Sequence, residues 1–186
     1  MHEASNDIAR WDVLSRRVLS ETKVFDVEGR RMRRADDRRE GDFSFVVAPD
    51  WVNVVALTDD DELVLVEQWR HARDHVTLEI PGGTVDGGES PREAAERELL
   101  EETGYRARQW ARLGSIEPNP AILTNCCHTF LALGARKEAE PAFEGNEHCV
   151  TVLRPWRDAA RLVREGRITH ALVVVALTYE MLRRGA

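Results

Sequence analysis

The stretch Gly82–Tyr105, GGTVDGGESPREAAERELLEETGY, decides how this chain is organised. Its first part, residues 82–88, is rich in glycine, which lets the backbone take left-handed conformations and pass close to a ligand. The SPRE sequence at 90–93 has the form of a capping box with proline at the first helical position. Gly104 is a typical helix end. The stretch therefore predicts a glycine-rich loop followed by a helix over Pro91–Thr103.

The predicted helix carries three acidic residues on one face. At about 100° per residue, Glu98 and Glu102 project within about 40° of each other, and Glu101 lies about 60° to the other side of Glu98. Such a face can simply be solvated, but clustered carboxylates also suit Mg²⁺, which prefers oxygen ligands. Arg97 lies among these acids, where it can hold one of them in an ion pair and orient the rest.

These residues resemble the Nudix box, in which the order is Gly, five residues, Glu, seven residues, then Arg-Glu-aliphatic-x-Glu-Glu-x-Gly-aliphatic. The matching positions are Gly83, Glu89, Arg97, Glu98, Leu99, Glu101, Glu102 and Gly104, and Tyr105 replaces the final aliphatic residue. The resemblance implies an α/β fold, an α/β/α sandwich around a mixed β-sheet. It also implies that Mg²⁺, or Mn²⁺, is held by Glu98, Glu102 and the Gly82 carbonyl with support from Glu101. Gly83, Glu89, Arg97 and Gly104 would then be structural residues of the box.

The segment before the box predicts two apolar strands, Trp51–Leu57 and Leu63–Trp69, followed by a short strand, Val76–Ile80, that brings Glu79 to the glycine loop. The phrase EQWR…TLEIPGG resembles the ADP-ribose and nucleotide-sugar pyrophosphatase branch of the family. This resemblance implies that Arg70 contacts phosphate, that Glu79 lies in the substrate pocket, and that Trp51 belongs to the substrate-binding residues. From the residues alone, Arg70 could equally form a surface salt bridge and Glu79 could be a solvated strand end.

The segment after the box contributes two further candidates. Pro120 follows Gly104 at the distance that marks the ADP-ribose pyrophosphatase branch, which places it with the substrate-binding residues, although a proline can also just stiffen a loop. Relatives in this branch place a catalytic Glu on a mobile loop, and here the polar loop Ala135–Glu147 corresponds to it. Glu147 matches best as the general base and Glu144 second, unless both are only solvated loop acids.

The N-terminal residues 1–47 predict three short strands, with turns indicated at Gly29 and Gly41. A segment of this kind buries little surface on its own, so we expect it to pack against a second copy. The resemblance likewise implies a homodimer built on this sheet. We therefore divide the chain into an N-terminal dimerisation segment, 1–47, and a Nudix hydrolase domain, 48–186.

Composition restricts the class of protein further. The chain has 186 residues and a net charge of −7, and an acidic pI near 5.4 argues against a nucleic-acid partner. Residues 1–11 lack the apolar core of a secretory signal, and the longest apolar run, Ala171–Leu177, is too short to cross a membrane. Three cysteines, two of them adjacent, indicate reduced thiols and a cytoplasmic location.

Together these features predict a Mg²⁺-dependent pyrophosphohydrolase. Its substrate would be ADP-ribose or a nucleotide sugar, and its products a nucleoside monophosphate and a sugar phosphate. Two alternatives remain. One is a Nudix hydrolase of coenzyme A, a dinucleoside polyphosphate or an oxidised nucleotide, and the other is a non-catalytic sensor of nucleotide sugars.

Overall fold

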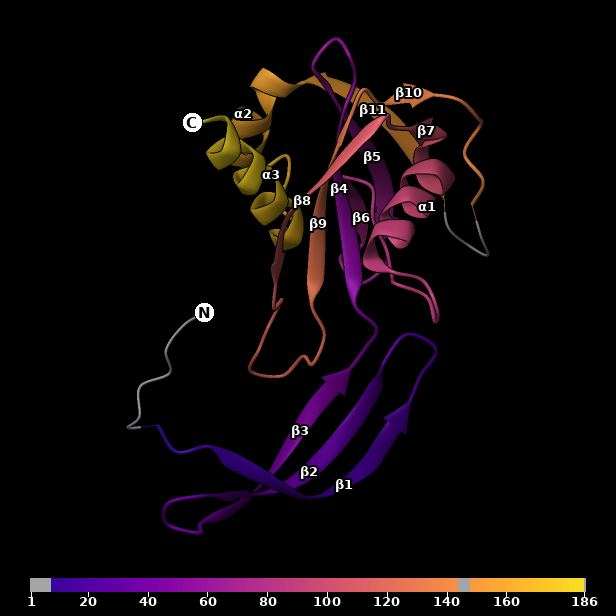
Figure 1. Ribbon diagram of the computed structural model, residues 1–186. Helices are drawn as coiled ribbons and strands as arrows, with labels where there is room; N and C mark the ends of the chain where they lie inside the picture. The colour runs from indigo at the N-terminus through magenta and orange to yellow at the C-terminus, as the bar shows by residue number, and fades with distance from the viewer. Residues whose placement is uncertain (1–7, 144–147, 186) are drawn as a thin grey trace. The chain divides into compact units, whose positions relative to one another are not determined.

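The computed structural model describes residues 8–143 and 148–185, and these pack as two compact units. One unit contains residues 8–49 and the loop Glu117–Asn125. The other contains Asp50–Ile116 and the chain from Cys126 onward. Figure 1 labels the elements of both units.

The first unit is a three-stranded antiparallel sheet of β1 (Trp11–Glu21), β2 (Asp26–Arg34) and β3 (Glu40–Val47). The turns expected at Gly29 and Gly41 are wrong, because both glycines lie inside strands. A Cβ at Gly29 would lie 3.2 Å from the Leu19 side chain of the neighbouring strand. Gly29 is therefore explained by cross-strand packing rather than by a turn.

The loop Glu117–Asn125 joins this sheet, which the sequence did not indicate. Val46 donates its backbone N–H to the Ile122 carbonyl (2.8 Å) and accepts from the Thr124 N–H (3.2 Å). The loop thereby pairs with the end of β3, and Pro120 lies in the unit formed by the N-terminal sheet.

The second unit is built on a mixed sheet with the strand order β11-β5-β4-β9-β8 and with β6 paired to β5 (Figure 1). Its strands are β4 (Trp51–Leu57), β5 (Glu62–Arg70), β6 (His75–Glu79), β8 (Gln109–Ile116), β9 (Cys127–Leu133) and β11 (Cys149–Pro155). The strands β7 (Tyr105–Arg106) and β10 (Arg136–Lys137) of the same unit form a separate two-stranded sheet. The pair β4–β9 is parallel and the other pairs are antiparallel.

Helices cover both faces of the mixed sheet, as Figure 1 shows. Side chains of β4 alternate: Val54 and Ala56 pack with helix α1 (Pro91–Thr103), whereas Val55 and Leu57 pack with the C-terminal helices. Those helices are α2 (Ala159–Arg164), preceded by the 3₁₀ turn η1 (Trp156–Asp158), and α3 (Ala171–Arg184). The expected α/β/α sandwich around a mixed sheet is confirmed.

Helix α1 has the predicted bounds because its predicted caps form. The Ser90 hydroxyl accepts the Glu93 N–H (3.3 Å), and the Glu93 carboxylate accepts the Ser90 N–H (2.7 Å), which completes the capping box. Gly104 ends the helix in the left-handed conformation, with φ 74°. Its carbonyl accepts the N–H groups of Glu138 and Ala139, so the helix end also anchors β10.

Gly104→Ala should destabilise the protein more than Gly166→Ala. Both glycines have positive φ, which costs an alanine about 1–2 kcal/mol. A Cβ at Gly104 would also lie 2.0 Å from the Ala139 carbonyl oxygen, whereas one at Gly166 meets nothing within 4 Å. Urea unfolding of both variants should therefore show a larger loss for Gly104→Ala by at least about 1 kcal/mol. Equal losses would contradict the close backbone contact.

No helix in the described part of the chain is long and apolar enough to span a membrane. The three cysteines are free, and Cys127 and Cys149 are buried. Burial raises the pKa of the Cys127 thiol to about 12, so this thiol stays protonated at neutral pH.

Candidate active site

The glycine-rich loop lies directly against the start of β4. Val52 and Gly83 exchange backbone hydrogen bonds of 2.9 and 3.1 Å, and Val54 donates to the Pro81 carbonyl at 2.9 Å. A Cβ at Gly82 would lie 2.3 Å from the Val52 carbonyl oxygen, so only glycine fits at this position. Trp51, at the first position of β4, forms a bridge with Thr84 and thus borders the loop.

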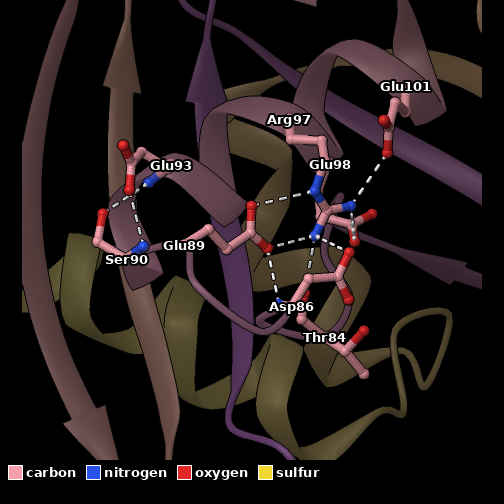
Figure 2. Close-up of polar contacts among 8 residues, drawn as sticks. All are labelled: Thr84, Asp86, Glu89, Ser90, Glu93, Arg97, Glu98 and Glu101. Atoms are coloured by element: carbon pink, nitrogen blue, oxygen red, sulfur yellow. Dashed lines mark hydrogen bonds and ion pairs between the residues drawn. The ribbon is translucent and has the colours of Figure 1, made fainter.

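Arg97 of α1 binds the loop to the helix (Figure 2). Its guanidinium donates to the Thr84 carbonyl at 2.9 Å and to Glu89 at 2.8 Å. It also donates to Glu98 at 2.8 Å and to Glu101 at 3.0 Å. Glu89 in turn accepts the Asp86 N–H at 2.8 Å. Arg97 and Glu89 therefore connect the glycine-rich loop to α1.

This network carries more negative than positive charge. Four carboxylates, those of Asp86, Glu89, Glu98 and Glu101, surround the one guanidinium of Arg97 and leave an excess of three negative charges. Hydrogen bonds from Arg97 lower the pKa of Glu89, and the same bonds raise the pKa of Arg97. The Glu89 carboxylate therefore remains ionised at neutral pH, and the excess of carboxylates makes the potential beside the glycine loop negative.

The carboxylates of the three acids on the helix face contact either the glycine loop or Arg97. Glu98 lies against Gly83, where a Cβ would meet its Oε1 at 2.3 Å. Glu102 instead accepts the Gly82 N–H at 2.9 Å, and Glu101 turns to Arg97. Across residues 8–143 and 148–185, no three His, Cys, Asp or Glu side chains form a ready metal cage.

The donor set nevertheless fits a hard divalent cation. Glu98 and Glu102 both border the Gly82–Gly83 backbone, so carboxylate and carbonyl oxygens lie in one small region. The Pro81 and Gly83 carbonyls accept hydrogen bonds from β4, which agrees with the expectation that Gly82 supplies the backbone ligand. The glycine at position 83 leaves the space that the Glu98 carboxylate occupies.

Arg70 and Glu79 form a bidentate ion pair at the edge of the sheet. Arg70 Nε and Nη2 donate to the two Glu79 oxygens at 2.8 and 2.7 Å. Thr77 donates to the same carboxylate at 2.7 Å, and His170 Nδ1 lies 2.9 Å from it. Burial raises the pKa of Glu79, but these hydrogen bonds outweigh burial and lower it overall. Glu79 is 3% exposed, so it is not a solvated strand end.

Strand alternation places this pair on the same side of the sheet as the box helix. Val64 of β5 packs with α1, and Arg70 follows at an even spacing along the same strand. Leu78 and Ile80 pack with the C-terminal helices, so the intervening Glu79 points to the other face.

The remaining predicted residues fall elsewhere. Pro120 belongs to the unit of the N-terminal sheet. Glu144 and Glu147 lie outside the described residues.

Sequence reasoning missed Thr77 and His170 as partners of Glu79. Thr77 could have been found because residues i and i+2 of a strand share a face. His170 precedes α3 at the N-cap position, where Ser, Thr, Asp or Asn is usual, and that anomaly was a usable signal. The ring nitrogens of His128 on β9 contact Asp50 (2.9 Å) and Ser115 (2.6 Å), so this histidine is held by its neighbours.

Comparison with known proteins decides the family. A model of the NUDIX domain matches residues 47–174, well over half of the chain. The chain belongs to the Nudix family. It is accordingly a Nudix pyrophosphohydrolase, as the box predicted.

Two named relatives and one solved structure each match most of this Nudix chain. It is 34% identical over 136 residues to a methanol dehydrogenase activator of Bacillus methanolicus, covering 73% of this chain and 74% of that protein. It is 29% identical over 180 residues to an ADP-ribose pyrophosphatase of Bacillus subtilis, covering 95% and 92%. A solved structure of an ADP compounds hydrolase has a TM-score of 0.84 at 22% identity and covers 98% and 99% of the two chains. This last likeness supports the fold.

Proposed function

We propose that the protein hydrolyses the diphosphate of ADP-ribose or a nucleotide sugar in a Mg²⁺-dependent reaction. The observation that carries this proposal is the excess of carboxylates gathered by Arg97 and the glycine loop along one face of α1. The ADP-ribose pyrophosphatase relative, which matches 95% of this chain, favours this substrate class over coenzyme A or an oxidised nucleotide.

The box residues would hold the cation. Glu98, Glu102 and the Gly82 carbonyl are the proposed ligands, and Glu101 supports them. A bound divalent cation neutralises diphosphate charge and acidifies water. Arg97 orients Glu98 and Glu101, since its guanidinium contacts both.

The remaining residues would bind substrate and move a proton. Arg70, which is 42% exposed at its side chain, contacts a phosphate group of the substrate. Water attacks one phosphorus, the bond from that phosphorus to the bridging oxygen breaks, and two monophosphates leave. Glu147, or Glu144 as the second choice, accepts the proton of the water.

A substrate panel tests this function. The chain is incubated with ADP-ribose, GDP-mannose, UDP-glucose or coenzyme A, with and without Mg²⁺ or Mn²⁺, and the products are separated by chromatography. We expect metal-dependent release of a nucleoside monophosphate from ADP-ribose or a nucleotide sugar. Turnover of coenzyme A alone, or equal turnover after chelation of metal, would contradict the proposal.

We infer that the N-terminal sheet forms a homodimer. Val13, Val18 and Phe43 of this sheet are each more than a third exposed. A three-stranded sheet with apolar side chains in solvent is poorly stable alone, and a second copy of the same sheet would bury them.

Sedimentation tests the dimer. At micromolar concentration the full chain should have twice its mass of 21.1 kDa, and Val18→Glu should shift it toward the monomer. Val150→Glu is the matched control, because Val150 is 52% exposed on β11 of the other unit. A monomeric wild-type chain, or equal dissociation by the two variants, would contradict this interface.

A further inference from the structure

The Glu79 carboxylate is saturated with hydrogen-bond donors. Its Oε1 accepts from Arg70 Nε at 2.8 Å and from Thr77 at 2.7 Å. Its Oε2 accepts from Arg70 Nη2 at 2.7 Å and lies 2.9 Å from His170 Nδ1. A carboxylate offers about four acceptor sites, so all of them are in use. Glu79 therefore orients its partners and has no site left for a substrate donor.

The contact with Glu79 fixes the protonation of His170 Nδ1. The donors around Glu79 hold its pKa low despite burial, so its carboxylate is ionised and can only accept hydrogen bonds. Nδ1 of His170 must therefore carry a proton. The ring is held in one orientation, in the way that a carboxylate orients a histidine in many enzyme sites.

Helix capping does not explain a histidine at this position. His170 is the N-cap residue of α3, but its side chain makes no capping hydrogen bond. The side chain instead reaches Glu79, which is far away in the sequence. Because the His170 side chain contacts a distant acid and does not cap the helix, its role lies outside the helix.

The surroundings of His170 point to a ligand. The start of α3 is tied to β4, since Asn53 Nδ2 donates to the Leu172 carbonyl at 3.2 Å. The Oδ1 of Asn53 is buried and has no partner within the described residues, and such an acceptor is usually satisfied by a bound molecule or water. Asn53 also borders the glycine loop, because a Cβ at Gly82 would lie 2.9 Å from its Cα.

The side chains of Glu79, Arg70 and His170 differ in their exposure to solvent. The side chain of Glu79 is 4% exposed, whereas those of Arg70 and His170 are 42% and 41% exposed. A buried acid thus lies beneath the half-exposed guanidinium of Arg70 and the half-exposed ring of His170, whose Nδ1–H is used by Glu79. The positively charged guanidinium suits an anionic group arriving from solvent.

We propose that His170 is a positioning residue for the diphosphate of the substrate. By donating Nδ1–H to Glu79, it fixes the Glu79–Arg70 pair in the orientation in which Arg70 receives a phosphate group. This role rests on the proposed diphosphatase function and adds to it a residue from α3, outside the Nudix box.

Three variants of the full chain separate this role from a merely structural one. His170→Ala removes the donor, and we expect KM for ADP-ribose to rise about 10-fold with kcat changed less than about twofold. His170→Asn places an amide N–H near the position of Nδ1 and should restore KM to within about threefold. His75→Ala is the matched control, because His75 lies on β6 but contacts the Arg73 carbonyl instead. The melting temperature of each variant is measured alongside.

A second readout is independent of turnover. In ¹⁵N NMR spectra at alkaline pH, the His170 ring should show the Nδ1–H tautomer, and Glu79→Ala should return it to the usual Nε2–H form. Calorimetry with α,β-methylene ADP-ribose should show the same order of affinities as the KM values.

The outcomes are distinct. An Nε2–H tautomer in the wild-type chain, or a wild-type KM in His170→Ala, overturns the role of His170 and leaves the diphosphatase function standing. Failure of His170→Asn to restore KM overturns the positioning role as well. A wild-type chain that neither binds the methylene analogue nor hydrolyses any diphosphate of the panel overturns the proposed function and this role with it.

Discussion

Glu102→Gln should reduce kcat by more than about 100-fold at saturating Mg²⁺ while leaving the fold intact. Loss of groups that only orient metal ligands already costs about 10- to 100-fold, so loss of a ligand charge should cost more. The glutamine carbonyl can still accept the Gly82 N–H that Glu102 Oε2 now accepts at 2.9 Å. The loop should therefore keep its place, and only the charge offered to the cation is lost.

Glu96→Gln is the control for this variant. Glu96 lies on the same helix, is 45% exposed at its side chain, and pairs with Arg92 at the surface. Its removal should change kcat by less than about twofold, since exposed ion pairs contribute little. Melting curves in the absence of metal should show Glu102→Gln at least as stable as wild type. Near-normal turnover by Glu102→Gln at saturating Mg²⁺ would refute the ligand role.

Arg97→Gln should lower both activity and stability. The guanidinium joins the loop carbonyl of Thr84 to the carboxylates of Glu89, Glu98 and Glu101, and no glutamine can replace all of these bonds. We expect kcat/KM to fall about 10- to 100-fold, as for other residues that orient metal ligands. The free energy of unfolding should fall by about 1–3 kcal/mol, because half-buried acids lose their donor.

The stability loss of Arg97→Gln should depend on pH. Arg97 lowers the folded-state pKa of Glu89, and a lowered carboxyl pKa contributes stability above the unfolded pKa that is lost as pH falls through the folded value. The gap between wild type and variant should thus be largest near neutral pH. It should shrink below about pH 4, where carboxyl groups protonate.

Arg92→Gln provides the comparison, measured by urea unfolding across the same pH range. Arg92 pairs with the surface acid Glu96 and lies 4.8 Å from the Trp110 ring, so its loss should cost less than about 1 kcal/mol at any pH. A pH-independent gap for Arg97→Gln, or equal losses in the two variants, would contradict the charge network described here.

The box could be predicted well because its structure is set by neighbours in the sequence. The Ser90 cap acts on Glu93 and the Gly104 stop on Leu100, each within a few residues along the chain. Those local rules were enough to give α1 its bounds. The acid pattern also placed Arg97 among the right carboxylates, since residues i and i+4 of a helix are neighbours.

Features that depend on distant contacts could not be predicted. His170 meets Glu79 only through the packing of α3, so an unusual N-cap could single out the histidine but not its partner. Glu180 is fully buried in α3 and pairs with Arg183 and Arg184. Gly29 reads as a turn residue in isolation, yet the side chain of Leu19 from the adjacent strand explains it.

Helical periodicity placed the acids on one face of α1 but did not predict the contacts of their carboxylates. Spacing alone places Glu98, Glu101 and Glu102 together, whereas in the folded chain Glu98 and Glu101 share Arg97 and Glu102 accepts the Gly82 N–H. Periodicity describes where side chains leave the helix axis, and the ends of long side chains are then set by charge and hydrogen bonding.

Mn²⁺ binding followed by electron paramagnetic resonance tests the central claim most directly, that the acids beside the glycine loop hold a divalent cation. The titration is made on wild type, Glu98→Gln, Glu102→Gln and Glu96→Gln in the presence of α,β-methylene ADP-ribose. We predict that wild type and Glu96→Gln deplete the signal of free Mn²⁺ equally, and that the other two variants bind at least about 10-fold more weakly. Equal binding by all four proteins would contradict the account.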